Sequence, residues 1–161
     1  MYEITLFIHS WLRWAVILLT MIVLFKSIYG YVSKTRYDKT DNNLMIFLVA
    51  SAHTQLILGL LLYFVLSPIS SAGMSDFPSA MKNPALRYWT VEHGLGMILF
   101  VLFVQIARTS SKKTIDPVMK FKKQMIYLGI SMFILTINSP WPQRQEGIAR
   151  HYFMDFPKSL R

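Results

Sequence analysis

The chain has 161 residues, of which 53% are hydrophobic and 16% charged, and its formal net charge at pH 7 is +9. A soluble domain of this length has more surface than so few polar residues can cover, so the composition favours a membrane protein. Because the chain contains no cysteine, disulfides, thiolate metal sites, iron–sulfur clusters and covalently attached c-type haem are excluded.

Four apolar stretches follow one another along the chain, at residues 4–28, 44–66, 86–108 and 118–138. Each approaches the ~20 residues that a membrane-spanning helix needs, although the fourth does so only with its flanks. The first stretch lacks a basic start and an Ala-x-Ala-like cleavage site, so we expect it to be retained rather than removed as a signal peptide.

Backbone polar groups in lipid must be hydrogen-bonded within the protein, which makes helices the expected structure of all four stretches. Short connections then give an all-α fold, an integral membrane four-helix up-down-up-down bundle. We expect this bundle to occupy residues 1–139 and an external C-terminal tail to occupy residues 140–161.

The basic residues gather at the first and third connections, whereas the second connection carries only Lys82. By the positive-inside rule, connections one and three are cytoplasmic and both termini lie outside. Contact with anionic lipid headgroups also accounts for the positive charge, so no nucleic-acid partner is needed. The tail argues against this orientation, because translocated tails are usually poorer in basic residues. Its basic residues are Arg144, Arg150, Lys158 and Arg161.

Polar residues at membrane depth are the candidates for function, because each is costly in lipid unless it has a partner. The first stretch carries His9 and Arg13, the second carries His53, and the third carries Glu92 and His93. From the helical rise, Arg13 and Glu92 both lie roughly 10–14 Å below the outer surface. They are therefore expected to form an ion pair between the first and third helices.

The three intramembrane histidines suggest a non-covalent b-type haem, because haem iron takes axial imidazoles from facing helices of a bundle. By depth the better pair is His9 with His93, and His53 with His93 is the second choice. Arg13, one turn from His9, is suited to neutralising a haem propionate, and glycines at 59, 94 and 96 would leave room for a flat macrocycle. Such residues also join membrane helices by ordinary hydrogen bonds, which is the alternative explanation.

Four strings carry a resemblance to a known family: His-Ser-Trp-Leu-Arg-Trp from His9, Gln-Leu-Ile-Leu-Gly-Leu-Leu-Leu-Tyr from Gln55, Arg-Tyr-Trp-Thr-Val-Glu-His from Arg87, and Pro-Trp-Pro from Pro140. With these strings the chain resembles short bacterial four-helix membrane proteins labelled cytochrome b-like. The resemblance implies a place in the bacterial cytoplasmic membrane. In that family the position matching His53 is often acidic, which favours the His9/His93 pair.

Two functions follow as expectations. The first is a membrane haem b electron carrier or small redox subunit, with quinone or respiratory subunits as partners, since the chain has no nucleotide or phosphate-binding motif of its own. The second is a non-redox accessory subunit of a membrane complex, or a small transporter with a polar path lined by Arg13, Glu92 and the histidines. No catalytic motif is present in either case.

Overall fold

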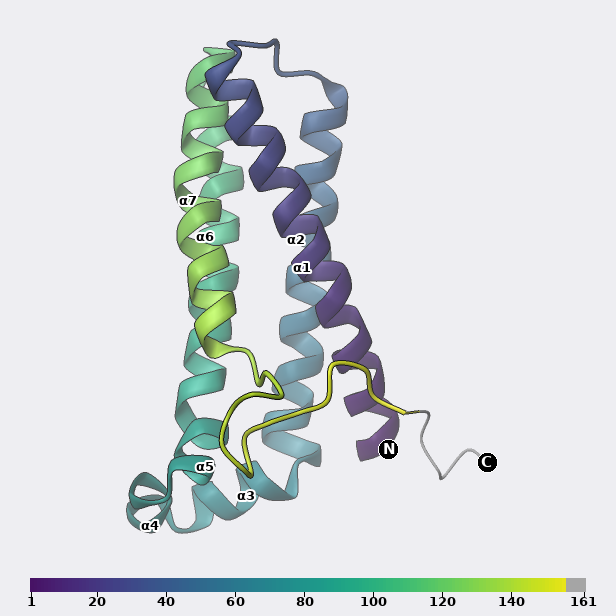
Figure 1. Cartoon of the computed structure of the whole chain (residues 1–161), viewed down its shortest axis with the longest axis vertical. Coiled ribbons are helices and arrows are strands. Elements are labelled where there is room, and N and C mark those ends of the chain that lie inside the picture. Colours follow the sequence, from purple (N-terminus) through teal and green to yellow (C-terminus); the bar gives the residue numbers. More distant parts are fainter. Residues whose placement is uncertain (156–161) are drawn as a thin grey trace.

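A computed structural model describes residues 1–155, and its secondary structure over this range is entirely helical. Four long helices lie side by side (Figure 1): α1 (Tyr2–Val32), α2 (Lys39–Leu61), α6 (His93–Lys112) and α7 (Pro117–Asn138). Two short π-helices extend this set, with η1 (Leu62–Leu66) continuing α2 and η2 (Tyr88–Glu92) preceding α6. The predicted helices are therefore present, and residues 156–161 of the predicted tail lie outside the described residues.

Three short helices, which the sequence analysis did not predict, form the second connection: α3 (Pro68–Ser75), α4 (Phe77–Lys82) and α5 (Pro84–Arg87). Each begins with a side-chain cap, from Ser67, Asp76 and Asn83 respectively, and with proline in its first turn. These residues satisfy or remove the amide groups that a helix start leaves unpaired. The connection is thus folded tightly against the end of the long helices.

Among the described residues, three helices are long and apolar enough to cross a membrane: Tyr2–Val32, Lys39–Leu66 and Pro84–Lys112. The fourth expected span, α7, is helical but more polar. Its first half contains Lys120, Lys122, Lys123 and the buried Gln124. By length and composition, then, three of the four expected spans are found.

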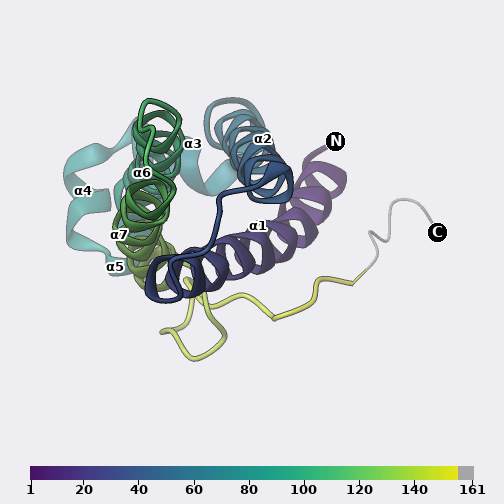
Figure 2. The same cartoon turned by 90° about the horizontal axis from the view of Figure 1, so that it is seen from above.

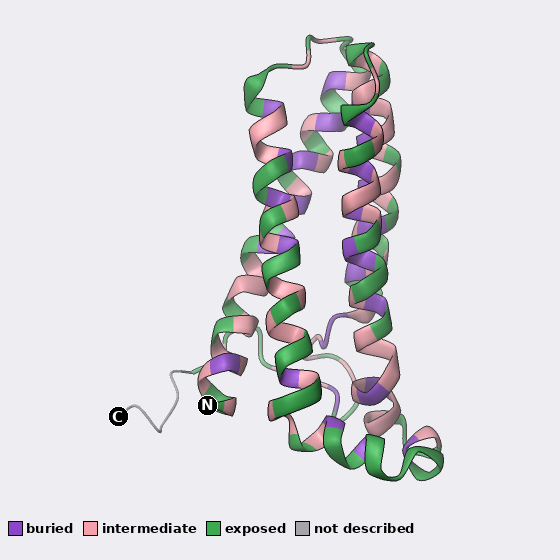
Figure 3. Ribbon diagram, turned by 180° about the vertical axis from the view of Figure 1, so that it is seen from behind, coloured by how far each residue is buried: buried purple, intermediate pink, exposed green. Residues whose placement is uncertain are grey.

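The four long helices carry large apolar side chains on their exposed faces as well as in their core; Figure 3 marks which positions are exposed and which are buried. Phe25, Phe47, Ile57 and Phe133 are each more than 60% exposed, whereas Thr20 and Ser131 are fully buried. The helices of a water-soluble bundle keep their outward faces polar. The surface therefore suits a lipid environment.

Near the basic connections, a buried polar network joins three of the helices and the first connection. The Gln124 amide donates to the Tyr37 hydroxyl (2.9 Å) and to Ser111 Oγ (3.2 Å), and its oxygen accepts from Ser27 (3.2 Å). Burial raises the pKa of Tyr37, so this hydroxyl stays neutral. Lys26 forms an ion pair with the buried Asp41 at 2.6 Å. Buried polar groups that are fully paired in this way fix the helices relative to one another.

At the same end, α1 crosses close to α7. A Cβ built on Gly30 would lie 2.6 Å from three ring atoms of the buried Phe121. Toward its N-terminus α1 inclines away from α7, as two perpendicular views show (Figures 1 and 2). The neighbouring pairs are α1 with α2, α2 with α6, α6 with α7 and α7 with α1, so α1 and α6 are diagonal.

The substitution Gly30→Ala should lower the free energy of unfolding by about 1–3 kcal/mol, because the added methyl group forces the Phe121 ring out of its packed position. Thermal unfolding of the purified protein in detergent measures this change. Gly129→Ala is the matched control, since nothing lies within 4 Å of its Cβ position; it should be neutral or stabilise by up to about 1 kcal/mol. Equal melting temperatures for the two variants would contradict the close crossing.

Candidate functional site

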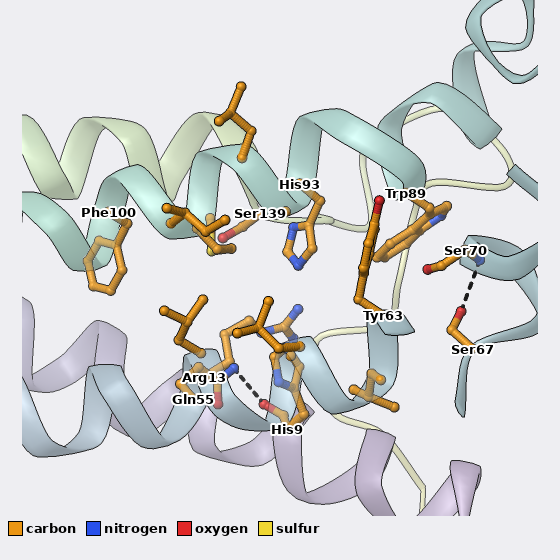
Figure 4. A pocket seen from close by; sticks show the side chains of 18 of the residues that line it. His9, Arg13, Gln55, Tyr63, Ser67, Ser70, Trp89, His93, Phe100 and Ser139 are labelled. Carbon is orange, nitrogen blue, oxygen red and sulfur yellow. Dashed lines mark hydrogen bonds between the residues drawn. The ribbon is translucent and has the colours of Figure 1, made fainter. Parts of the chain in front are cut away.

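A cavity of about 460 Å³ lies where α1 and α7 have diverged, at the end of the molecule opposite the basic connections (Figure 4). Its volume falls within the roughly 300–1,000 Å³ of typical ligand pockets. The walls are mainly apolar, with polar side chains contributed by His9, Arg13, Gln55 and His93. Phe64 and Leu95 line the cavity and are also more than half exposed, so its wall reaches the apolar outer surface.

His9 and His93 reach this cavity from diagonal helices. Figure 4 shows the two imidazoles entering it from opposite sides, His9 from α1 and His93 from α6. The sequence analysis predicted this pair from depth alone, and both residues line one cavity. Arg13, one turn further along α1, lines it as well.

The orientation of the His93 ring is fixed by the end of α7. Its Nδ1 lies 2.9 Å from the Asn138 carbonyl oxygen, and because a carbonyl only accepts, Nδ1 carries the proton. Nε2 is then the unprotonated nitrogen and has a free lone pair. Histidines that bind metals commonly hold their other ring nitrogen in this manner.

The last carbonyls of α7, which have no partner within the helix, are all satisfied by side chains. The Thr136 carbonyl accepts from Trp141 Nε1 (2.6 Å), and the Asn138 carbonyl accepts from His93 Nδ1 and from the Tyr88 hydroxyl (2.6 Å). Arg144 donates to the carbonyls of Ile137 and Ser139. These bonds attach both His93 and the following segment to the end of α7.

Four polar side chains around the cavity hold a buried atom without a hydrogen-bond partner in the described chain: His9 Nδ1, Arg13 Nε, Gln55 Oε1 and Thr90 Oγ1. The other buried atom of this kind, Asp41 Oδ1, belongs to the ion pair with Lys26. Leaving such an atom unpaired costs about 1–3 kcal/mol. All four residues line the cavity, but these particular atoms are covered by protein, with the Cβ position of Gly59 lying 3.8 Å from His9 Nδ1, so a ligand would reach them only after side chains shift.

His53 lies elsewhere. Its ring is exposed, its Nδ1 is 2.8 Å from the Val49 carbonyl one turn earlier, and it does not line the cavity. The alternative pair of His53 with His93 is thus not brought together at this site.

The expected ion pair between Arg13 and Glu92 is absent from the described residues. Glu92 pairs instead with Arg87 at 2.7 Å, and Arg13 Nη2 donates to the Tyr152 carbonyl (3.3 Å). The reason is η2: a π-helix bonds residues five apart, which places Arg87 above Glu92. The equal depths of Arg13 and Glu92 were calculated with the α-helical rise, which does not apply within η2.

Both π-helices line the cavity and are joined to each other. The Tyr63 hydroxyl on η1 donates to the Thr90 carbonyl on η2 at 2.6 Å. Short π-segments inside α-helices are often found at functional sites. The sequence analysis did not predict these π-helices. The available signal is that residues able to contact each other stand five positions apart, as Arg87 and Glu92 do and as Tyr88 and His93 do.

Sequence reasoning also missed the C-terminal segment. Residues 141–155, here called the C-terminal strap, belong to the predicted external tail of residues 140–161, which was given no site residue. They run from the end of α7 across the N-terminal half of α1 (Figures 1 and 2), and Arg150 lines the cavity. Its position depends on tertiary hydrogen bonds that leave no local pattern.

Of the glycines expected to make room for a macrocycle, Gly59 and Gly94 line the cavity and Gly96 does not. A Cβ on Gly96 would lie 2.3 Å from the Asn138 side chain, whereas nothing lies within 4 Å of the Cβ position of Gly94. Gly96 therefore serves the close contact of α6 with the end of α7.

Within residues 1–155, no group of three or more His, Asp or Glu side chains is gathered to hold a metal ion. A bis-imidazole haem needs only two such ligands, because the porphyrin supplies the others. No family model, curated protein or solved structure matches the chain. The site must be interpreted from its own chemistry.

Gly96→Ala should displace Asn138 and release His93 Nδ1 from its carbonyl, destabilising the protein by about 1–3 kcal/mol. Gly94→Ala, two residues earlier on the same helix, should leave both stability and His93 unchanged. Nitrogen-15 NMR of labelled histidine gives the tautomer of His93, which should be Nδ1–H in the parent and in G94A and mixed in G96A. A pure Nδ1–H tautomer in G96A would contradict the tether.

Proposed function

We propose that the chain is an integral membrane protein whose four long helices cross the bilayer as an up-down-up-down bundle. The exposed apolar faces of α1, α2, α6 and α7 support this proposal. Lys120 and Lys122 near the start of α7 can extend toward headgroups at the basic end, so α7 is still able to cross. The basic connections support a cytoplasmic position for that end in a bacterial cytoplasmic membrane, with both termini outside.

Single cysteines test the topology cleanly, because the chain has none of its own. Ser71 and Lys112 are both exposed and lie at opposite ends of the bundle. Ser71→Cys should react with a membrane-impermeant maleimide on intact cells, and Lys112→Cys only after the membrane is permeabilised. Reaction of both from the same side would contradict the proposed spans.

Within this bundle, we propose that the cavity binds a b-type haem and that the protein carries electrons in the membrane. The observation that carries the proposal is that His9 and His93, from diagonal helices, line one cavity, and that the bond of His93 Nδ1 to the Asn138 carbonyl leaves its Nε2 free. His9 and His93 would be the axial ligands, and Arg13 would face a propionate. The haem would supply one-electron chemistry.

The same proposal extends to the electron partner. The cavity wall reaches the apolar outer surface at Phe64 and Leu95, which supports a lipid-dissolved quinone or a neighbouring redox subunit as donor or acceptor. The resemblance to the cytochrome b-like proteins points in the same direction. An electron carrier needs a donor and an acceptor, so the proposal includes such a partner.

The purified protein, reduced with dithionite, should show the sharp alpha band of a six-coordinate low-spin b-type haem. His93→Ala should abolish this band, and His9→Ala should convert the haem to a high-spin or weakly bound form, because each variant removes one axial ligand. His53→Ala is the matched control and should keep the parent spectrum, since its ring is exposed and bonded within α2.

A colourless preparation, made in haem-producing cells and taking up no haem on reconstitution, would overturn the redox proposal. The accessory-subunit or transporter alternative would then lead, with the same unpaired polar atoms lining the path. A full loss of the band in H53A together with its retention in H9A would instead overturn the choice of ligands.

A further inference from the structure

The C-terminal strap is held beside the cavity by hydrogen bonds from α1, which carries His9, and from η2, which directly precedes His93. On α1, Trp14 Nε1 donates to the Tyr152 carbonyl (2.8 Å) and Trp11 Nε1 to the Met154 carbonyl (3.3 Å). On η2, directly before His93, Trp89 Nε1 donates to the Gly147 carbonyl (2.8 Å). The strap is therefore fixed at both sides of the cavity.

Aromatic packing supports the same placement. The Phe153 ring stacks on Trp14, with centroids 5.7 Å apart, and also contacts Trp11 at 5.5 Å. Ile148 is only 6% exposed. A segment with these contacts is part of the folded structure, and its side chains have defined positions at the cavity.

Arg150 is the strap residue that enters the cavity wall. Its guanidinium lies 4.7 Å from the centre of the Trp89 ring, and its backbone amide donates to the Pro140 carbonyl (3.1 Å). Its Nη1 donates only to the adjacent Ala149 carbonyl (3.0 Å). Donors of this guanidinium that are not engaged in that bond are available to a ligand.

Arg13 reaches the same cavity from α1 with its Nε buried and unpaired. Within residues 1–155 the ion pairs are Lys26–Asp41 and Arg87–Glu92. Neither Arg13 nor Arg150 is therefore neutralised by a described carboxylate. Two guanidinium groups at one mainly apolar cavity are costly without an anion, and guanidinium groups bind carboxylates in a bidentate manner.

We propose that Arg13 and Arg150 together recognise carboxylate groups at one end of an apolar ligand, so that the C-terminal strap completes the binding site. The ligand class is an amphiphile with an acidic end, and for the haem of the proposed function these acids are the two propionates. The inference rests on the same cavity as that function. It adds a second anion-binding residue, and it makes the strap a determinant of ligand choice.

The test compares acids with their esters. Purified ligand-free protein in detergent is titrated with haem b and with its dimethyl ester, which keeps the iron and ring but lacks the negative charges. The ratio of the two dissociation constants measures carboxylate recognition separately from iron ligation. The parent protein should prefer the diacid.

Arg150→Gln should reduce this preference about tenfold to a hundredfold, the usual range for a charge-assisted hydrogen bond, and Arg13→Gln should act in the same direction. Arg150→Lys should retain part of the preference, because it keeps the charge without the planar fork. The matched control is Arg144→Gln, in the same strap. Arg144 contacts the α7 carbonyls and Tyr88 and does not line the cavity, so any weakening should affect acid and ester equally.

An unchanged acid-to-ester ratio in R150Q, or an equal fall of the ratio in R144Q, would overturn the inference. If neither haem compound binds the parent, the haem proposal fails by itself. The same comparison is therefore run with a fluorescent fatty acid and its methyl ester. A preference for that acid, lost in R150Q and kept in R144Q, would support carboxylate recognition without haem, and no preference would overturn it.

Discussion

The carbonyls at the end of α7 that have no partner within the helix are the constraint on which the site depends. A helix end in an apolar environment needs donors from elsewhere in the protein. Here these donors come from Tyr88 and His93 on one side and from Trp141 and Arg144 on the other. The same requirement therefore fixes the ring of His93 and turns the chain back toward the cavity.

The cavity itself follows from how α1 is packed. The close approach at Gly30 and the network around Gln124 hold α1 against α7 at the basic end. The inclination of α1 then separates the two helices toward the other end, where side chains no longer fill the space (Figure 2). Tight packing at one end and a cavity at the other are thus two results of one crossing.

The helices and the presence of His9 and His93 at one cavity were predictable, because apolar length and helical rise are properties of the local sequence. The partners of Glu92 and Arg13 were not, since they depend on a π-turn and on a backbone carbonyl 139 positions away in the chain. Arg150 was missed for a similar reason. The basic tail gave no local pattern, and only its tertiary hydrogen bonds bring this residue to the cavity.

The π-turn before His93 has a consequence for how this helix tolerates insertions and deletions. One residue more or less rotates everything beyond it by about 100° around the helix axis. Within η2, the change would turn Tyr88 and Trp89 away from the faces they share with His93, while α6 kept its contacts with α7. A homologue shortened by one residue here would keep its helices but lose the contacts of Tyr88 and Trp89 with His93.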